Sequence, residues 1–237
     1  MALALRWYPP SWVQIKTRNL VIYLDPSYLK KYFLDHPTAR EYSDWPDEVD
    51  GLPDDLEKAD IILVTHHHKD HVKKVTVDRI KNPDTLIVAP EKVKDVLGEK
   101  IMVVTPGEEI IQDEVKIKVL PAYNTLEGSS TKKFHHPGVG VGYLLEIDGH
   151  RIYHAGDTDL IPEMDELGRV DVAFLPIGGT YTMNVKEAAQ ATLKIKPAIV
   201  IPIHHLQADP QDFALELRGE GIKTRILRIG ELLMVGE

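Results

Sequence analysis

The stretch from His66 to His71 reads HHHKDH, so four imidazoles and one carboxylate lie within six residues. Imidazole and carboxylate groups are the side chains that bind transition metals when thiolates are absent. The 237 residues include no cysteine, so a transition-metal site in this chain must use His, Asp or Glu. The stretch therefore predicts a metal site.

The apolar run from Ile61 to Val64 precedes this stretch and reads as a buried strand. An extended backbone beyond it would put His66 and His68 on one side, with Asp70 placed to cap a following helix and His71 at the turn. In the helical alternative, His67 and His71 share a face as in zinc proteases, but Glu is missing after His67. A solvated turn is the other alternative, although clustered imidazoles repel one another when protonated unless a cation shares their lone pairs. We favour a strand followed by a metal-binding loop.

His66, His68, Asp70 and His71 match the His-x-His-x-Asp-His signature, and here the chain resembles the metallo-β-lactamase fold superfamily. The resemblance extends to LDP at 24–26, YHAGDT at 153–158, LPIGGTYTM at 175–183 and IPIHH at 201–205. Together these stretches are similar to the branch that contains L-ascorbate-6-phosphate lactonase and other metal-dependent hydrolases. The resemblance implies an α/β fold, the αββα four-layer sandwich, with one or two metal ions at a sheet edge. We expect one domain over residues 1–237.

By the same resemblance, Asp157 bridges the metal ions and His204 is the last histidine ligand, with Asp25 as a hydrogen-bond partner of a ligand histidine. The implied ligands are His66, His68 and His135 on one ion and Asp70, His71 and His204 on the other, with Asp157 between them. This donor set suits one or two Zn²⁺ ions and is also compatible with Mn²⁺ or Fe²⁺.

The third ligand of the first metal departs from the family pattern. Many relatives carry His shortly after a strand like VKIKVLPA, where this chain has Asn124, and asparagine is a poor zinc ligand. Either the downstream FHHPGVGVGY stretch supplies His135 or His136, or fewer protein side chains hold this ion. We favour His135, because a similar FHP stretch occurs in this branch, and the alternatives stay open.

The implied reaction is hydrolysis of an ester, lactone or phosphodiester small molecule by a metal-activated water. Asp70 would also orient that water, and Tyr181 is a further catalytic candidate as a donor to the leaving group. His154 is expected to be structural, and His205 either contacts substrate or packs. The alternatives are a compact metal-dependent nuclease and a non-catalytic, metal-stabilised binding protein. A redox di-iron role is disfavoured, since such relatives carry Glu at the place of His68.

The amino-acid composition limits the kinds of molecule that this chain is expected to bind. With 37 acidic and 28 basic residues the net charge is −9, which disfavours nucleic acid and leaves a small-molecule substrate as the expected partner. No apolar run approaches the ~18 residues of a spanning helix, and MALALRWYPP lacks a long signal-peptide core. We expect a cytoplasmic protein without membrane contact, and association into a homo-oligomer is compatible with the sequence.

Apolar, β-branched runs predict strands at 20–25, 61–65, 85–89, 115–120, 140–148, 150–155, 171–176, 198–204 and 224–229. Helices are expected near 72–81, 91–97, 184–195 and 210–218, the third capped by Asn184. Residues 28–53 and 122–140 read as long loops that form the pocket wall. Their candidate substrate contacts are Lys132 and Lys133, which suit a phosphate or form a solvated pair, and the aromatic residues Tyr32, Phe33, Tyr42 and Trp45.

Overall fold

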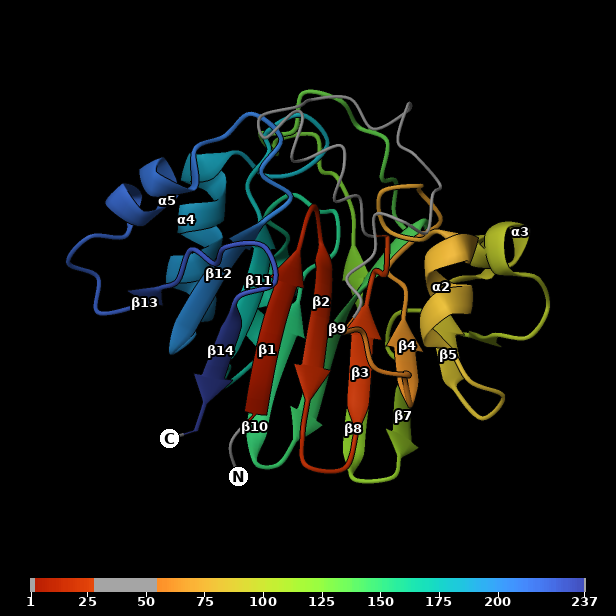
Figure 1. The fold of residues 1–237 in the computed structure, drawn as a ribbon. Helices are drawn as coiled ribbons and strands as arrows, with labels where there is room; N and C mark the ends of the chain where they lie inside the picture. The colour runs from red at the N-terminus through yellow and green to blue at the C-terminus, as the bar shows by residue number, and fades with distance from the viewer. Residues whose placement is uncertain (1–2, 28–54, 237) are drawn as a thin grey trace. The chain divides into compact units, whose positions relative to one another are not determined.

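The computed structural model describes residues 3–27 and 55–236, and the chain divides into two compact units. Unit 1 comprises Met1–Val104 and Leu227–Glu237, and unit 2 comprises Thr105–Ile226. Each unit contains a seven-stranded mixed sheet with flanking helices (Figure 1). The predicted α/β class is therefore confirmed.

The sheet of unit 1 has the order β14-β1-β2-β3-β4-β5-β6. Its strands are β1 Leu3–Tyr8, β2 Trp12–Lys16, β3 Val21–Leu24, β4 Ile61–Leu63, β5 Leu86–Ala89, β6 Met102–Val103 and β14 Leu232–Val235. Pairing is antiparallel from β14 to β3 and parallel from β3 to β6. The carboxyl ends of β3 and β4 therefore lie next to each other.

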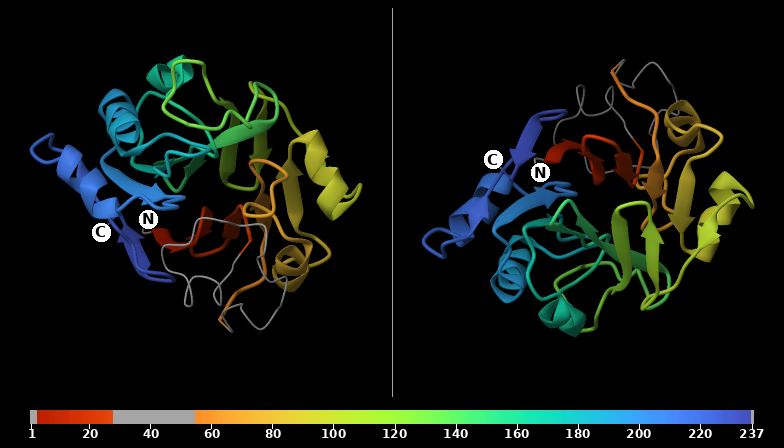
Figure 2. Two further views of the ribbon diagram at one scale, coloured as in Figure 1. Left: turned by 90° about the horizontal axis from the view of Figure 1, so that it is seen from above. Right: turned by 90° about the horizontal axis from the view of Figure 1, so that it is seen from below.

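Among the described residues of unit 1, three short helices accompany this sheet: α2 Lys74–Ile80, the 3₁₀ helix η2 Glu91–Val93 and α3 Lys94–Leu97. Val77 and Ile80 of α2 belong to one buried cluster with Ile62 of β4 and Tyr23 of β3. Figure 2 shows α2 and α3, in yellow, beside the strands of this unit. The packing of α2 fixes the segment that connects it to β4, which carries the histidine cluster.

The sheet of unit 2 has the order β13-β12-β11-β10-β9-β8-β7. Its strands are β7 Glu109–Gln112, β8 Val115–Ala122, β9 Gly140–Ile147, β10 His150–His154, β11 Val172–Pro176, β12 Ile199–Ile203 and β13 Lys223–Thr224. Pairing is antiparallel from β7 to β10 and parallel from β10 to β13. The carboxyl ends of β10, β11 and β12 thus share one edge.

The helices of unit 2 are η3 Pro162–Glu166, α4 Val185–Ile195 and α5 Pro210–Glu216. The apolar face of α4, including Ala188 and Ala191, belongs to one buried cluster with Ala173 and Leu175 of β11. Asn184 caps α4 as predicted, since its side chain accepts a hydrogen bond from the Glu187 amide.

The prediction of a strand at 224–229 is wrong. Only Thr224 of this range lies in a strand, because β13 is an edge strand that pairs with β12 over two residues. Leu227 is nevertheless buried, so its apolar character reflects packing and not a ladder of hydrogen bonds. The loop expected at 28–53, with its four aromatic residues, lies outside the described residues.

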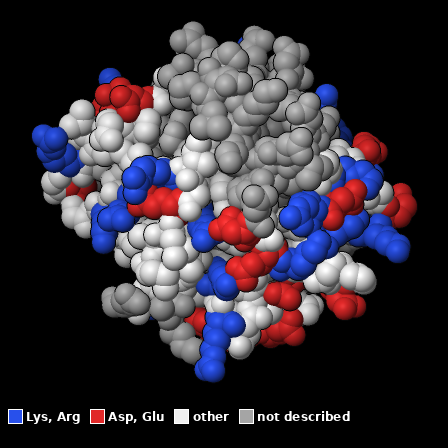
Figure 3. Space-filling view, in the orientation of Figure 1, with Lys and Arg blue, Asp and Glu red and all other residues white. Residues whose placement is uncertain are grey.

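Within the described part of the chain, no helix has the length and apolar character needed to cross a membrane. On the face drawn in Figure 3, basic and acidic side chains are interspersed among the coloured residues. Exposed ion pairs include Lys16 with Glu57 and Lys74 with Asp78.

Candidate metal centre

The histidine stretch leaves the end of β4 as a turn. The amides of His71 and Val72 both donate to the His68 carbonyl, at 2.9 and 3.0 Å. The strand-to-loop prediction is confirmed, and the helical alternative is wrong for this segment. The expectation that Asp70 caps the next helix is also wrong, because the turn delays the start of α2 to Lys74, with Lys73 at the N-cap position.

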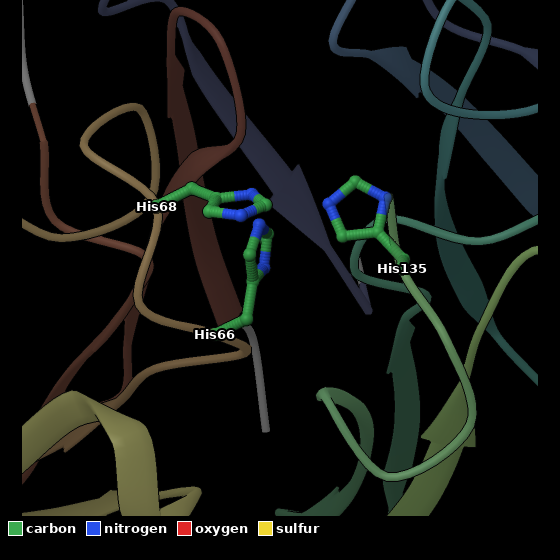
Figure 4. A group of neighbouring side chains, drawn as sticks. All are labelled: His66, His68 and His135. Carbon is green, nitrogen blue, oxygen red and sulfur yellow. The ribbon is translucent and has the colours of Figure 1, made fainter. Parts of the chain in front are cut away.

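Three imidazoles of this turn lie against one another. His66 and His71 are buried, with ring centroids 4.0 Å apart, and the half-buried His68 ring meets His66 edge-on at 4.6 Å. Figure 4 shows the His66 and His68 rings at this angle. The Asp70 carboxylate lies 3.9 Å from His71 Nε2, whereas Lys69 is exposed. Unit 1 thus gathers three imidazoles and a carboxylate at the end of one strand.

The buried Asp25 carboxylate fixes the orientation of two of these rings. Its Oδ1 accepts from the Thr65 amide at 2.7 Å, and its Oδ2 accepts from the Thr65 hydroxyl and from His71 Nδ1, each at 2.7 Å. Because the Thr65 proton is used on Asp25, the 2.9 Å contact of Thr65 Oγ1 with His66 Nδ1 has His66 as its donor. Both rings therefore carry a proton on Nδ1 and a lone pair on Nε2.

This arrangement is the one that metal-binding histidines need, since the ring nitrogen opposite the metal donates to a carboxylate or another fixed oxygen. Asp25 directly follows β3, the parallel neighbour of β4, with a φ of 48°. Such a left-handed conformation costs a non-glycine residue about 1–2 kcal/mol. The expected contact of Asp25 with a histidine of this stretch is present, to His71.

A second donor cluster lies in unit 2. Asp157 is buried and follows β10 through Ala155 and Gly156, and Gly156 has a φ of 65°. His204 is buried directly after β12, with a φ of 48°. Ligand-binding residues commonly follow the carboxyl ends of parallel strands, and both residues do so here.

The imidazoles of His135 and His204 converge on Asp157. His135 Nε2 lies 3.5 Å and His204 Nε2 lies 3.4 Å from the same atom, Asp157 Oδ2. A direct charge-assisted hydrogen bond would be shorter, about 2.7–2.9 Å. Two ligands bonded at about 2.0–2.1 Å to one tetrahedral ion lie about 3.3 Å apart. The donor set and its spacing therefore fit a metal ion.

His135 lies on the loop after β8 and reaches Asp157 from there. Figure 4 labels the His135 ring. His136 is exposed, and both polar atoms of the Asn124 side chain are hydrogen-bonded to backbone groups of His135 and Tyr181. His135 Nδ1 donates to the Tyr181 carbonyl at 3.2 Å, which leaves the Nε2 lone pair toward Asp157. Of the three candidates at this place, His135 alone presents a ring nitrogen to Asp157.

Comparison with known proteins identifies the family of this chain. The model of the β-lactamase superfamily domain matches residues 4–204. A UPF0173 metal-dependent hydrolase of Anoxybacillus flavithermus is 34% identical over 97% of this chain and 98% of its own length. One from Pyrococcus furiosus is 41% identical over 76% of this chain and 84% of its own length.

The chain belongs to the metallo-β-lactamase superfamily. Within it, the chain is a member of the UPF0173 metal-dependent hydrolases, so it is a metal-dependent hydrolase. A crystal structure of a metal-dependent hydrolase from Parabacteroides distasonis is similar, with a TM-score of 0.78 and 33% identity over 96% of this chain and 93% of the other. A metallo hydrolase of Ignicoccus hospitalis has a TM-score of 0.77 and 26% identity over the full length of both chains. The predicted metallo-β-lactamase fold is confirmed.

Two other histidines of this UPF0173 hydrolase form hydrogen bonds with backbone groups. His154 Nδ1 accepts from the Gly156 amide at 3.2 Å, next to Asp157. His205 Nε2 donates to the Pro202 carbonyl at 2.8 Å, and burial lowers the pKa of His205 to about 4. Both histidines thus stabilise the chain next to a proposed ligand.

The two lysines of the loop after β8 have different surroundings. Lys133 Nζ donates to the buried Asp159 carboxylate at 3.1 Å, and also to Gly128 and Ser130. Lys132 Nζ lies 5.4 Å from the centroid of the Tyr181 ring. Lys133 is therefore neither a solvated charge nor placed to bind a phosphate. The sequence did not indicate the roles of Asp159 and Thr65. The partner of Asp159 is Lys133, 26 residues earlier, and a partner of Thr65 is Asp25, 40 residues earlier.

Proposed function

We propose that this hydrolase cleaves an ester, lactone or phosphodiester small molecule at a centre of one or two Zn²⁺ ions. The proposed ligands are His66, His68 and His135 on one ion, Asp70, His71 and His204 on the other, and Asp157 on both. Each of these seven residues belongs to a group of side chains that could hold a metal ion. The observation that carries the proposal is the convergence of His135 Nε2 and His204 Nε2 on Asp157 Oδ2. Histidine and carboxylate donors without thiolate suit Zn²⁺, and they also accept Mn²⁺ or Fe²⁺.

A divalent ion bound by these residues would supply an activated water and polarise the bond to be cleaved. Asp70 would accept a hydrogen bond from that water and orient it, since its carboxylate keeps 14% of its surface exposed. The Ser27 hydroxyl donates to the Asp70 carbonyl and so holds the turn in place. Asp25 and Thr65 keep the lone pairs of His66 and His71 available.

Two aromatic side chains near the proposed ligands favour a substrate with an apolar or ring-containing part, and one of them lies on the loop after β8. Phe134 precedes His135, is 57% exposed, and stacks on Tyr181 with ring centroids 5.3 Å apart. An aromatic side chain held rigid and exposed beside a proposed ligand is suited to contact substrate. Tyr181 stays a candidate donor to the leaving group. Recognition of a phosphate would depend on Lys132, because Lys133 is engaged by Asp159.

Metal content per chain, measured by plasma mass spectrometry, tests the ligand set. We expect His68→Ala and Asp157→Ala to lose metal together with hydrolysis of p-nitrophenyl esters, lactones or bis(p-nitrophenyl) phosphate. The matched controls are His67→Ala, a neighbour of His68, and His136→Ala, which is exposed. Full metal content in Asp157→Ala, or equal losses in the controls, would contradict the assignment. Cleavage of an oligonucleotide, with no activity on these small molecules, would instead favour the nuclease alternative.

A further inference from the structure

We infer that Asn124 is a positioning residue that holds His135 in place as a metal ligand, an inference that rests on the proposed function. Asn124 follows β8, and His135 lies eleven residues later at the other end of the same loop. The Asn124 amide donates to the His135 carbonyl at 2.6 Å, and the His135 amide donates to Asn124 Oδ1 at 2.9 Å. These two reciprocal bonds close the loop and fix the backbone of His135.

The Tyr181 carbonyl connects the side chains of the same two residues. It accepts from Asn124 Nδ2 at 2.9 Å and from His135 Nδ1 at 3.2 Å. Because a carbonyl only accepts, His135 must carry its proton on Nδ1. In the neutral ring, the Nε2 lone pair then points to Asp157 Oδ2, 3.5 Å away. Asn124 thus places the carbonyl that sets both the orientation and the tautomer of the His135 ring.

The residue type is specific to this task. The Asn124 side chain uses its oxygen as an acceptor and its nitrogen as a donor, and it is 8% exposed. Aspartate at this position would lack the donor to Tyr181, and alanine would lack both groups. Since both polar atoms are used on backbone groups, the side chain acts on the metal through His135. Loss of such a partner of a ligand typically lowers metal affinity about 10–100-fold.

The test compares Asn124→Ala and Asn124→Asp with Asn184→Ala, a control in the same unit. Asn184 also makes a side-chain bond to a backbone amide, at the start of α4. Zn²⁺ affinity is measured by chelator competition at a temperature where every variant is folded, together with the visible spectrum of the Co²⁺-loaded proteins. We expect Asn124→Ala to lower affinity about 10–100-fold and to change the Co²⁺ spectrum, with a smaller effect for Asn124→Asp and none for Asn184→Ala.

An unchanged affinity and spectrum in Asn124→Ala would overturn the inference. The tautomer of His135, read from ¹H–¹⁵N spectra of the metal-free protein and assigned with His135→Gln, gives a readout that needs no metal. If the unmodified chain binds no metal, the proposed function fails, while the ring spectra still decide the role of Asn124. A tautomer unchanged in Asn124→Ala would then overturn it.

Discussion

Thr65 shows how one hydroxyl can orient two proposed metal ligands. It donates to Asp25 Oδ2 and accepts from His66 Nδ1, while the same Asp25 oxygen accepts from His71 Nδ1. All four residues are buried, so water cannot replace a lost partner easily. A buried polar group left without a partner costs about 1–3 kcal/mol.

We therefore predict that Thr65→Val, which keeps the shape and removes the hydroxyl, lowers Zn²⁺ affinity about 10–100-fold. Thr65→Ser keeps the hydroxyl and is expected to bind Zn²⁺ like the unmodified protein. Competition with a chromogenic chelator measures both. Equal affinities for Thr65→Val and Thr65→Ser would show that the hydroxyl does not tune the histidines.

The sequence indicates the candidate ligands of both units more readily than the contacts that orient them. Spacing alone indicated that His66 and His68 act together, and the pattern of the family pointed to Asp157 and His204. Neither Thr65 nor Asn124 could be assigned its role from the sequence. Their partners are Asp25, 40 residues before Thr65, and Tyr181, 57 residues after Asn124, and only the folded chain brings such groups together.

At the scale of elements, both sheets follow one pattern. Each has four strands in antiparallel pairing followed by parallel ones, and the proposed ligands or their partners follow the parallel strands. Asp25 follows β3 and His66 follows β4, while Asp157 follows β10 and His204 follows β12. The parallel region of each sheet therefore gathers donors from different strands at one edge.

The loop after β11 limits how the segment after β12 can move. A Cβ on Gly178 would lie 2.7 Å from the His204 carbonyl oxygen and 2.7 Å from Leu206 Cδ1. We predict that Gly178→Ala displaces His204 and clearly reduces metal content. The melting temperature of the metal-free protein should fall only slightly. Plasma mass spectrometry and calorimetry of metal-free samples measure the two effects. Full metal content would mean that the backbone of His204 has room to give way.

Central strands were predictable because a parallel strand buried on both faces reads as an apolar run, as Ile61 to Leu63 does. Edge strands were not, since β6 and β13 span two residues each and their sequences carry no period. β1 was also missed, although its burial alternates from Leu3 to Arg6. The predicted helices were found within a few residues, and Asn184 as a cap was the most specific of these predictions.

At the scale of the whole molecule, the family model spans residues 4–204 and thus includes parts of both units. Unit 1 contributes His66, His68, Asp70 and His71 to the proposed ligand set, and unit 2 contributes His135, Asp157 and His204. If the ions are shared as proposed, removing a donor from one unit must weaken the stabilisation that metal gives to the other unit. If each cluster binds its own ion, the two effects are independent.

Tryptophan fluorescence separates these cases, because Trp7 and Trp12 lie in unit 1 and the sequence of unit 2 contains no tryptophan. Metal at 1,000 times its dissociation constant stabilises the folded state by about 4 kcal/mol. We predict that Zn²⁺ shifts the thermal unfolding of unit 1, followed by tryptophan fluorescence, to higher temperature in the unmodified protein and in His136→Ala. In Asp157→Ala, altered only in unit 2, this shift should largely disappear. A full shift in Asp157→Ala would mean that the donors of unit 1 bind metal without unit 2, and the shared centre would have to be abandoned.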